Sequence, residues 1–211
     1  MQTKPHIIML HGWTIGDISD IPEYLPDSEE NWMGWAKKEL EGRGYKVDNP
    51  FIRFGYKSDY DGWKKEIEKL SIDENTILVG WSSGGAFWVR WLGETKQKVK
   101  KLILVAPSKV VGNSQKVLKP LWKLHADGKG PEFKAEWDSF HNFECDPTIK
   151  NRVSSITIFI SDDIEWLVES AKRYAKEFDA QLIKISGQGH FTNDERPSPA
   201  FPELLEAILK E

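Results

Sequence analysis

Short apolar runs that alternate with amphipathic stretches constrain the fold of this chain more than any other feature. Consecutive Ile, Leu and Val fill these runs, as in strands whose two faces are both covered by helices. The runs comprise residues 6–10, 45–52, 76–80, 101–106, 156–160 and 181–185. Strand and helix in alternation build a parallel sheet with right-handed crossovers. The sequence therefore predicts an α/β fold with a doubly wound, mostly parallel six-stranded sheet.

The stretches between the runs have the periodicity of amphipathic helices. The expected helices cover residues 28–41, 60–70, 84–95, 164–178 and 202–210. Asp27 and Glu30 at the start of the first helix are spaced like a capping box with aspartate as the cap, and Gly42 and Gly44 follow its end. We therefore expect a layer of helices on each side of the sheet.

One interval interrupts the alternation of strands and helices. Residues 107–155 contain no convincing strand. Long insertions of this kind in compact domains are often lids or binding loops. Because 211 residues is the size of a single domain, we expect one domain over residues 1–211, with 107–155 as a small lid or cap insertion.

Charge and cysteine content exclude several classes of protein. The formal net charge of -4 and the pI of about 5.8 argue against a nucleic-acid-binding protein, which needs a concentrated basic face. The lone Cys145 excludes an internal disulfide. The first apolar run is too short for a signal peptide or a membrane span. We therefore expect a cytoplasmic monomer or homodimer that binds neither nucleic acid nor a membrane.

Gly80, Ser82 and Gly84 form the pattern G-x-S-x-G between an expected strand and an expected helix. A turn this sharp forces its central residue into strained backbone geometry and needs glycines where a Cβ would collide with neighbours. Ser82 would then project above the C-terminal edge of the sheet as a nucleophile. The alternative interpretation is a tight connection whose serines cap the following helix.

A catalytic serine needs a base within hydrogen-bond reach and a carboxylate that orients the base. Asp162 and Asp163 follow the fifth apolar run, and His190 follows the sixth. Because the carboxyl ends of parallel strands share one edge, we expect His190 to be the base and one of the two aspartates to be the acid. The alternatives are a surface-loop histidine and helix-capping aspartates.

The same edge offers backbone donors for an oxyanion hole. One is the N–H of Ser83, and the other is the N–H of Trp13 in the turn after the first strand. The Ser83 hydroxyl has no predicted role. We expect His11 to form structural hydrogen bonds rather than to act as an acid or base, because no carboxylate near it in sequence is placed to orient it.

The insertion is rich in aromatic residues that could form an acyl-binding wall, with core packing as the alternative. Phe143 is one candidate for this wall. The residues predicted to line the substrate pocket are His11, Trp81, Trp122, Trp137 and Phe140.

The histidines and the cysteine of the insertion lack the tight spacing of metal ligands. His125, His141 and Cys145 could be imagined as ligands, but their spacing as a set does not match the usual ligand motifs. We therefore expect neither a metal nor an organic cofactor.

The motifs above give the chain a resemblance to a known family. The sequence carries "LHGW" near its start, "NWMGWAKKELEGRGYKV" before the second strand, "ENTILVGWSSGG" at the serine, "FISDD" at the acid and "GHF" with "FPELLEAILK" at the end. Over nearly its full length it is similar to the small single-domain serine hydrolases of the α/β-hydrolase superfamily that include YdeN and retinoblastoma-binding protein nine. The resemblance implies a reduced α/β-hydrolase fold.

The resemblance also bears on the acid and on the residue before the nucleophile. Family members commonly carry an aspartate followed by Pro, an aromatic residue or Val, and a second Pro. Here Asp163 is followed by Ile164, Glu165 and Trp166, and the resemblance still favours Asp163 over Asp162. Trp81 stands where the family usually has histidine.

The implied function is hydrolysis of small esters or related acyl bonds through an acyl-enzyme on Ser82. The changed residues after Asp163 favour an alternative, a non-catalytic protein-interaction module on the same scaffold. A second alternative is a carrier-protein methyl esterase, because "HGW" and "GWSSGG" resemble motifs of the methyl esterases that release pimeloyl groups from carrier protein.

Overall fold

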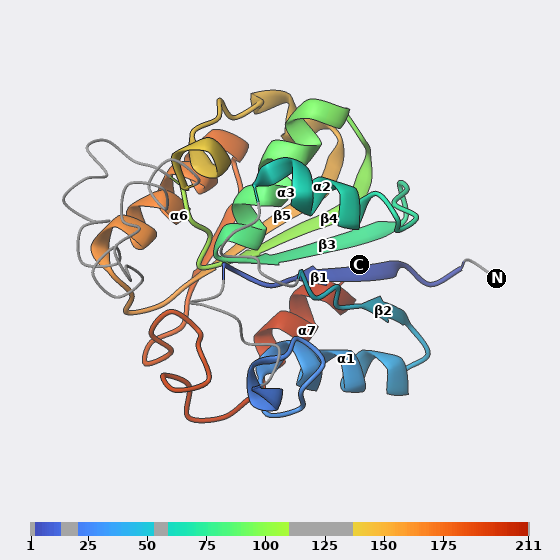
Figure 1. Ribbon diagram of the computed structural model, residues 1–211, viewed down its shortest axis with the longest axis vertical. Helices are drawn as coiled ribbons and strands as arrows, with labels where there is room; N and C mark the ends of the chain where they lie inside the picture. The colour runs from blue at the N-terminus through green and yellow to red at the C-terminus, as the bar shows by residue number, and fades with distance from the viewer. Residues whose placement is uncertain (1–2, 14–20, 53–58, 110–136, 211) are drawn as a thin grey trace.

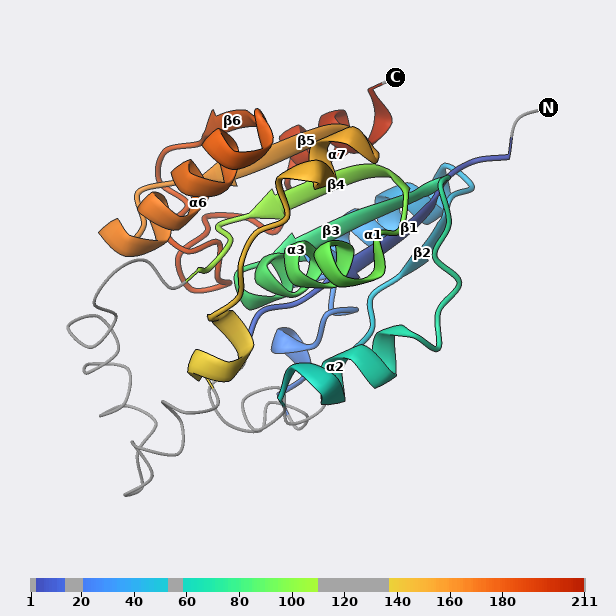
Figure 2. The same ribbon diagram turned by 90° about the horizontal axis from the view of Figure 1, so that it is seen from above.

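The computed structural model describes residues 3–13, 21–52, 59–109 and 137–210 of the chain. In this part of the chain, six parallel strands form one sheet in the order β2-β1-β3-β4-β5-β6, which confirms the predicted fold class. Figure 2 shows the strands side by side in that order. The strands are β1 (His6–Leu10), β2 (Lys46–Asp48), β3 (Thr76–Trp81), β4 (Val99–Val105), β5 (Val153–Ile160) and β6 (Gln181–Lys184).

Helices cover both faces of the sheet (Figure 1). The helices α2 (Tyr60–Ile67), α3 (Ser83–Thr95) and α6 (Glu165–Phe178) pack on one face, and α1 (Trp32–Gly42) and α7 (Pro202–Leu209) pack on the other. Short 3-10 helices lie at Pro22–Tyr24 and Pro147–Asn151, and residues 137–141 are also helical.

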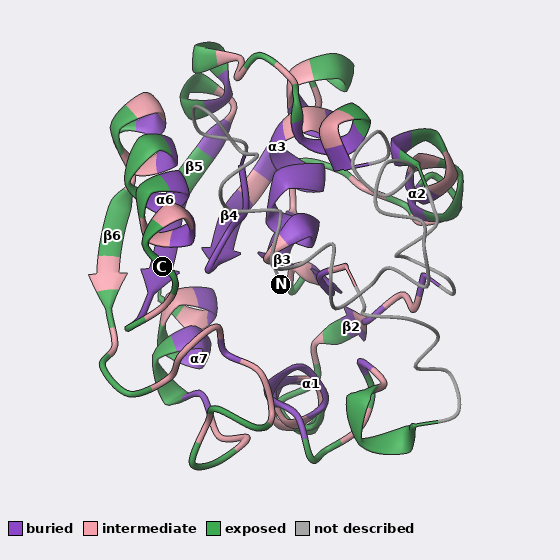
Figure 3. Ribbon diagram, turned by 60° about the vertical axis from the view of Figure 1, so that its left-hand side comes forward, coloured by how far each residue is buried: buried purple, intermediate pink, exposed green. Residues whose placement is uncertain are grey.

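The apolar runs supply side chains to two separate cores. Along β1, Ile8 and Leu10 pack in the core under α2, α3 and α6, whereas Ile7 and Met9 pack in the core under α1 and α7. Successive residues of a strand point to opposite faces, so a strand covered on both sides needs apolar residues at every position. Figure 3 shows the resulting buried centre of the sheet between exposed outer helix faces.

Two predicted boundaries lie about four residues from the observed ones, and each has a local cause. The strand predicted at 45–52 ends at Asp48, because Asn49 donates to the carbonyls of Pro26 and Met33 and the next residue is a proline, which cannot donate to the ladder. The first helix begins at Trp32 instead of residue 28.

The predicted capping box of the first helix is also wrong. Asn31 is the N-cap, and its side-chain oxygen accepts hydrogen bonds from the backbone N–H groups of Met33 and Gly34. Asp27 instead pairs with Lys37 at 2.9 Å. Asp and Asn are both common N-cap residues, and only the path of the chain decides between the two positions.

The insertion at 107–155 contributes no strand before Val153 among its described residues, as predicted. Its residues 110–136 lie outside the described residues, so its role as a lid stays a prediction. In the described parts of the chain, no helix combines the length and the apolar character needed to cross a membrane.

Candidate active site

The turn between β3 and α3 holds Ser82 in strained backbone geometry. Ser82 has φ 52° and ψ -117°, a conformation that non-glycine residues rarely adopt. A Cβ on Gly84 would lie 2.4 Å from the carbonyl oxygen of Leu10, and a Cβ on Gly80 would lie 2.7 Å from the backbone of Gly84. Both glycines are therefore required by close backbone approach at the turn.

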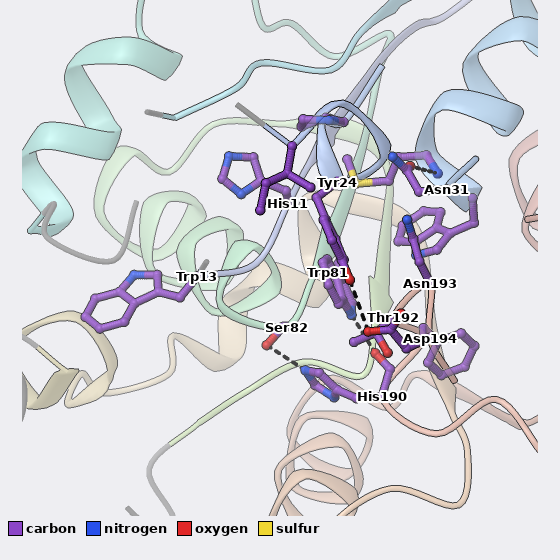
Figure 4. Close-up of a pocket in the computed structure, with 15 residues that line it drawn as sticks. His11, Trp13, Tyr24, Asn31, Trp81, Ser82, His190, Thr192, Asn193 and Asp194 are labelled. Atoms are coloured by element: carbon purple, nitrogen blue, oxygen red, sulfur yellow. Dashed lines mark hydrogen bonds between the residues drawn. The ribbon is translucent and has the colours of Figure 1, made fainter. Parts of the chain in front are cut away.

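The structure brings Ser82, His190 and Asp163 together in one hydrogen-bonded row at the C-terminal edge of the sheet. His190 Nε2 lies 3.0 Å from Ser82 Oγ, and His190 Nδ1 lies 2.5 Å from Asp163 Oδ2. Figure 4 shows the first of these bonds. A carboxylate can only accept, so Nδ1 carries the proton and Nε2 is free to accept the Ser82 hydroxyl proton.

The Asp163 carboxylate is nearly buried, with its side chain 4% exposed. Its other oxygen accepts a hydrogen bond from the N–H of Ile164 at 2.6 Å. The neighbouring Asp162 is exposed and instead accepts from the N–H of Gly187 and pairs with Lys184, which together lower its pKa. Asp162 therefore supports the loop before His190 and does not contact the imidazole.

Two further side chains hold the backbone of His190. Glu195 Oε2 accepts a hydrogen bond from the His190 N–H at 2.7 Å, and the indole N–H of Trp81 donates to the His190 carbonyl at 2.8 Å. The Trp81 ring also lies 5.7 Å from the imidazole, centroid to centroid. The residue that departs from the family pattern before the serine is thus a direct support of the histidine loop.

The backbone around Ser82 fixes the peptide that carries one predicted oxyanion donor, the N–H of Ser83. The Ser82 carbonyl accepts hydrogen bonds from the N–H groups of Gly85, Ala86 and Ser108 at 3.1–3.3 Å. In a trans peptide the Ser83 N–H points away from that carbonyl, and at the first position of a helix it has no intrahelical acceptor. A Cβ on Gly12 would lie 2.9 Å from Ser82 Cβ, so the chain that leads into Trp13 lies against the serine.

His11 is buried beneath this site and is fully hydrogen-bonded. Its Nδ1 donates to the carbonyl of Gly12 at 2.6 Å, and its Nε2 accepts from the N–H of Ile52 at 2.9 Å. Burial lowers the pKa of His11 to about 4, so the ring is neutral at pH 7. These bonds match the structural role expected for this residue.

A cavity of about 420 Å³ opens beside Ser82 and His190 (Figure 4). It lies at the crevice where the sheet order reverses direction between β1 and β3, the usual ligand position in open α/β sheets. The predicted residues His11 and Trp81 line it. Its other lining residues are Trp13, Ile21, Tyr24, Pro26, Asn31, Trp32, Met33, Phe191, Thr192, Asn193 and Asp194.

Trp137 and Phe140, predicted to line the pocket, are not among the described residues that line this cavity. Trp137 is 6% exposed and Phe140 1% exposed, and both rings pack against Trp13 at 5.3 Å and 5.5 Å between centroids. Core packing, the alternative interpretation, describes both. Phe143 packs against the same core, and Trp122 lies outside the described residues.

The pocket wall comes instead from the connection between β1 and α1 and from the loop after His190. Sequence reasoning missed Tyr24, Trp32 and Asp194 on these segments. The available signal was the long interval between the first strand and the first helix, because such connections flank the crevice between β1 and β3.

Most polar groups of the pocket are already hydrogen-bonded within the protein. The Tyr24 hydroxyl donates to Asp194 at 3.1 Å, and the Asn31 side chain is held by backbone groups on both its oxygen and its nitrogen. Among the described lining residues, Asp194 is the only carboxylate, and no Lys or Arg takes part. The cavity therefore presents an apolar wall with negative charge at its rim.

The Ser83 hydroxyl, which had no predicted role, is buried and hydrogen-bonded. It lies 3.0 Å from Nε2 of His141, a residue weighed in sequence only as a metal ligand. Within the described ranges, no cluster of His, Cys, Asp and Glu has the geometry of a metal site, and His125 falls outside those ranges.

Comparisons with known proteins place this geometry in a family context. Residues 21–206 match the model of the family described as serine hydrolase. No curated protein matches the sequence closely enough to count as a relative.

Solved structures show the same fold at low sequence identity. The ydeN gene product of B. subtilis superimposes with a TM-score of 0.71 at 20% identity, over 99% of this chain and 100% of that one. A putative YdeN-like hydrolase from Pectobacterium atrosepticum gives 0.60 at 16% identity, over 97% and 89%. A structure from a study of carboxylesterases of Nitrososphaera gargenis gives 0.61 at 14% identity, over 97% and 89%.

Proposed function

The chain belongs to the serine hydrolase family, and from this premise we propose that it cleaves small ester bonds through an acyl-enzyme on Ser82. The observation that carries the proposal is the row from Ser82 Oγ through His190 to Asp163, with separations of 3.0 Å and 2.5 Å. The Nitrososphaera gargenis structure, which shares the fold, comes from a study of carboxylesterases, and this likeness also supports ester cleavage.

In the proposed mechanism His190 is the general base and then the general acid. Nε2 takes the Ser82 proton as the oxygen attacks the carbonyl carbon, and Asp163 stabilises the imidazolium through Nδ1. The N–H groups of Ser83 and Trp13 bind the oxyanion of the tetrahedral intermediate. The imidazolium gives its proton to the leaving alcohol. His190 then takes a proton from water as the water attacks the acyl carbon, and it returns that proton to Ser82 Oγ as the acid leaves.

The cavity indicates the class of ester. Its aromatic and aliphatic walls suit an apolar group, and Asp194 at the rim disfavours a negatively charged one. We therefore propose small, uncharged esters as substrates. A small-molecule substrate rather than nucleic acid or a membrane, a monomeric or homodimeric state and a cytoplasmic location stay predictions.

Labelling with a fluorophosphonate tests the nucleophile. Wild-type protein should be labelled once, Ser82→Ala should not be labelled, and Ser154→Ala should label like wild type because this serine is exposed at the start of β5. Labelling that persists in Ser82→Ala would contradict the proposal.

Turnover of p-nitrophenyl acetate and butyrate by the same proteins tests the reaction. Equal rates for wild type and Ser82→Ala would favour the non-catalytic interaction module. A strong preference for carrier-linked over free methyl esters would favour the carrier-protein methyl esterase.

A further inference from the structure

A second serine–histidine pair lies behind the nucleophile turn. Ser83 Oγ is 3.0 Å from His141 Nε2, and the two residues are 1% and 0% exposed. His141 Nδ1 is 3.0 Å from the carbonyl of Trp137, which can only accept. The proton is therefore on Nδ1, and the Ser83 hydroxyl donates to Nε2.

This pair is not a second catalytic base and nucleophile. Neither Ser83 nor His141 lines the cavity beside Ser82. The ring stacks on Trp137 at 3.8 Å between centroids, and burial lowers the pKa of His141 to about 3. A neutral imidazole that is buried away from the cavity can hold its neighbours in place, but it cannot exchange protons with a substrate.

The Ser83 hydroxyl is held from two elements outside its own helix. His141 accepts its proton, and the Ser108 hydroxyl approaches its oxygen at 3.4 Å. The N–H of Ser108 also bonds the Ser82 carbonyl at 3.1 Å, within the peptide unit that carries the Ser83 N–H. Two sets of hydrogen bonds therefore fix the orientation of the Ser83 N–H. One acts on the Ser82 carbonyl of the same peptide unit, and the other acts on the Ser83 side chain.

The other proposed oxyanion donor is tied to the same histidine. The Trp13 ring lies edge-on to His141 at 5.7 Å and to Trp137 at 5.3 Å, centroid to centroid. Figure 4 shows this ring on the far side of Ser82 from Tyr24 and Asn193. Both residues proposed to supply the oxyanion donors therefore contact one buried side chain, that of His141.

We propose that His141 is a positioning residue that aligns the oxyanion hole, holding Ser83 through its hydroxyl and Trp13 through its ring. The inference rests on the proposed function, because it concerns the geometry of the same reaction. Without His141 the buried Ser83 hydroxyl loses its acceptor, and the cost of an unpaired donor drives a rearrangement of the first turn of α3. The N–H of Ser83 then moves away from the developing charge.

Two substitutions at His141 distinguish the effect of its hydrogen-bond acceptor from the effect of its size. His141→Phe keeps an aromatic ring and removes the acceptor, whereas His141→Gln offers a side-chain oxygen that can accept from Ser83. Loss of one oxyanion donor costs about 10²–10³ in kcat, so a displaced donor in His141→Phe should cost about 10-fold to 100-fold. KM should change little, because the interaction forms only in the transition state.

A trifluoromethyl ketone, which forms a tetrahedral adduct with an active-site serine, gives a second readout. Its affinity should fall in His141→Phe by the same factor as kcat/KM. His141→Gln should retain most of both. Ser83→Ala should also lower kcat, and the Ser83→Ala/His141→Phe double variant should lose less than the product of the two single losses, since both break one interaction.

Phe178→Leu, a change to a buried residue at the end of α6 whose ring stacks on Tyr174, is the control for a general loss of stability. The inference is overturned if His141→Phe and Ser83→Ala keep wild-type kcat and ketone affinity, whatever their unfolding midpoints. If His141→Phe does not fold, Ser83→Ala and His141→Gln decide by the same measurements. Activity that survives Ser82→Ala would reject the proposed function itself. An unchanged kcat in His141→Phe would reject only the positioning role of His141.

Discussion

Two buried histidines should make this protein lose stability in mild acid, with the loss beginning above the pH range in which carboxyl groups titrate. Burial lowers the pKa of His11 to about 4 and that of His141 to about 3, whereas a histidine in an unfolded chain has a pKa of about 6.5. Between these values the unfolded state binds protons that the native state does not. Stability from this source is therefore complete above about pH 6.5 and declines as the pH falls through the window.

The size of the effect follows from the two shifts. One pKa unit corresponds to about 1.4 kcal/mol, so each imidazole lowers the free energy of unfolding by about 2 kcal/mol between pH 8 and pH 5. The pair contributes about 4 kcal/mol, a large share of the roughly 5–15 kcal/mol that stabilises a typical domain.

Urea unfolding at several pH values between 8 and 5 measures this loss. His11→Gln and His141→Gln should each remove about half of the pH dependence, and the double variant should remove most of it. Side-chain nitrogen NMR at pH 5 should show both rings neutral in the native protein. A wild-type free energy of unfolding that is flat from pH 8 to 5, or a full pH dependence in the double variant, would refute the reasoning.

Three further predictions concern the site. Asp163→Asn should lower kcat by about 10³–10⁴-fold by disturbing the histidine tautomer, whereas Asp162→Asn should retain most of the wild-type kcat, measured on p-nitrophenyl butyrate. Gly84→Ala should destabilise the fold by about 3 kcal/mol or prevent folding, because its Cβ meets the Leu10 carbonyl at 2.4 Å, and an unchanged urea midpoint would contradict this. Asp194→Asn should raise kcat/KM for a carboxylate-bearing ester relative to its neutral analogue by about 5-fold, as expected for the removal of roughly 1 kcal/mol of repulsion near the surface.

The parts of the site that follow strand ends were predictable from sequence. Ser82, Asp163 and His190 each follow the end of an apolar run, and a parallel sheet brings such positions to one edge whatever their separation in sequence. The glycines of the turn were predictable for the same reason, since the close approach of α3 to the end of β1 is a property of the fold.

The pocket wall and the bond between Ser83 and His141 were not predictable in this way. Trp137 and Phe140 satisfy the composition of a binding wall and of a core equally well, and only the path of the chain places them against Trp13. The hydrogen bond between Ser83 and His141 joins residues 58 positions apart, and no periodic pattern in the sequence predicts it. Contacts set by loops rather than by regular elements leave little trace in a single sequence.

The positive φ of Ser82 places the proposed nucleophile but lowers the stability of the fold. A non-glycine residue in such geometry costs about 1–3 kcal/mol, whereas the added freedom of glycine in the unfolded chain costs only about 0.5–1 kcal/mol. Ser82→Gly should therefore be inert yet harder to unfold than the wild type. The backbone torsion that would present the proposed nucleophile is thus a local cost to the stability of the fold.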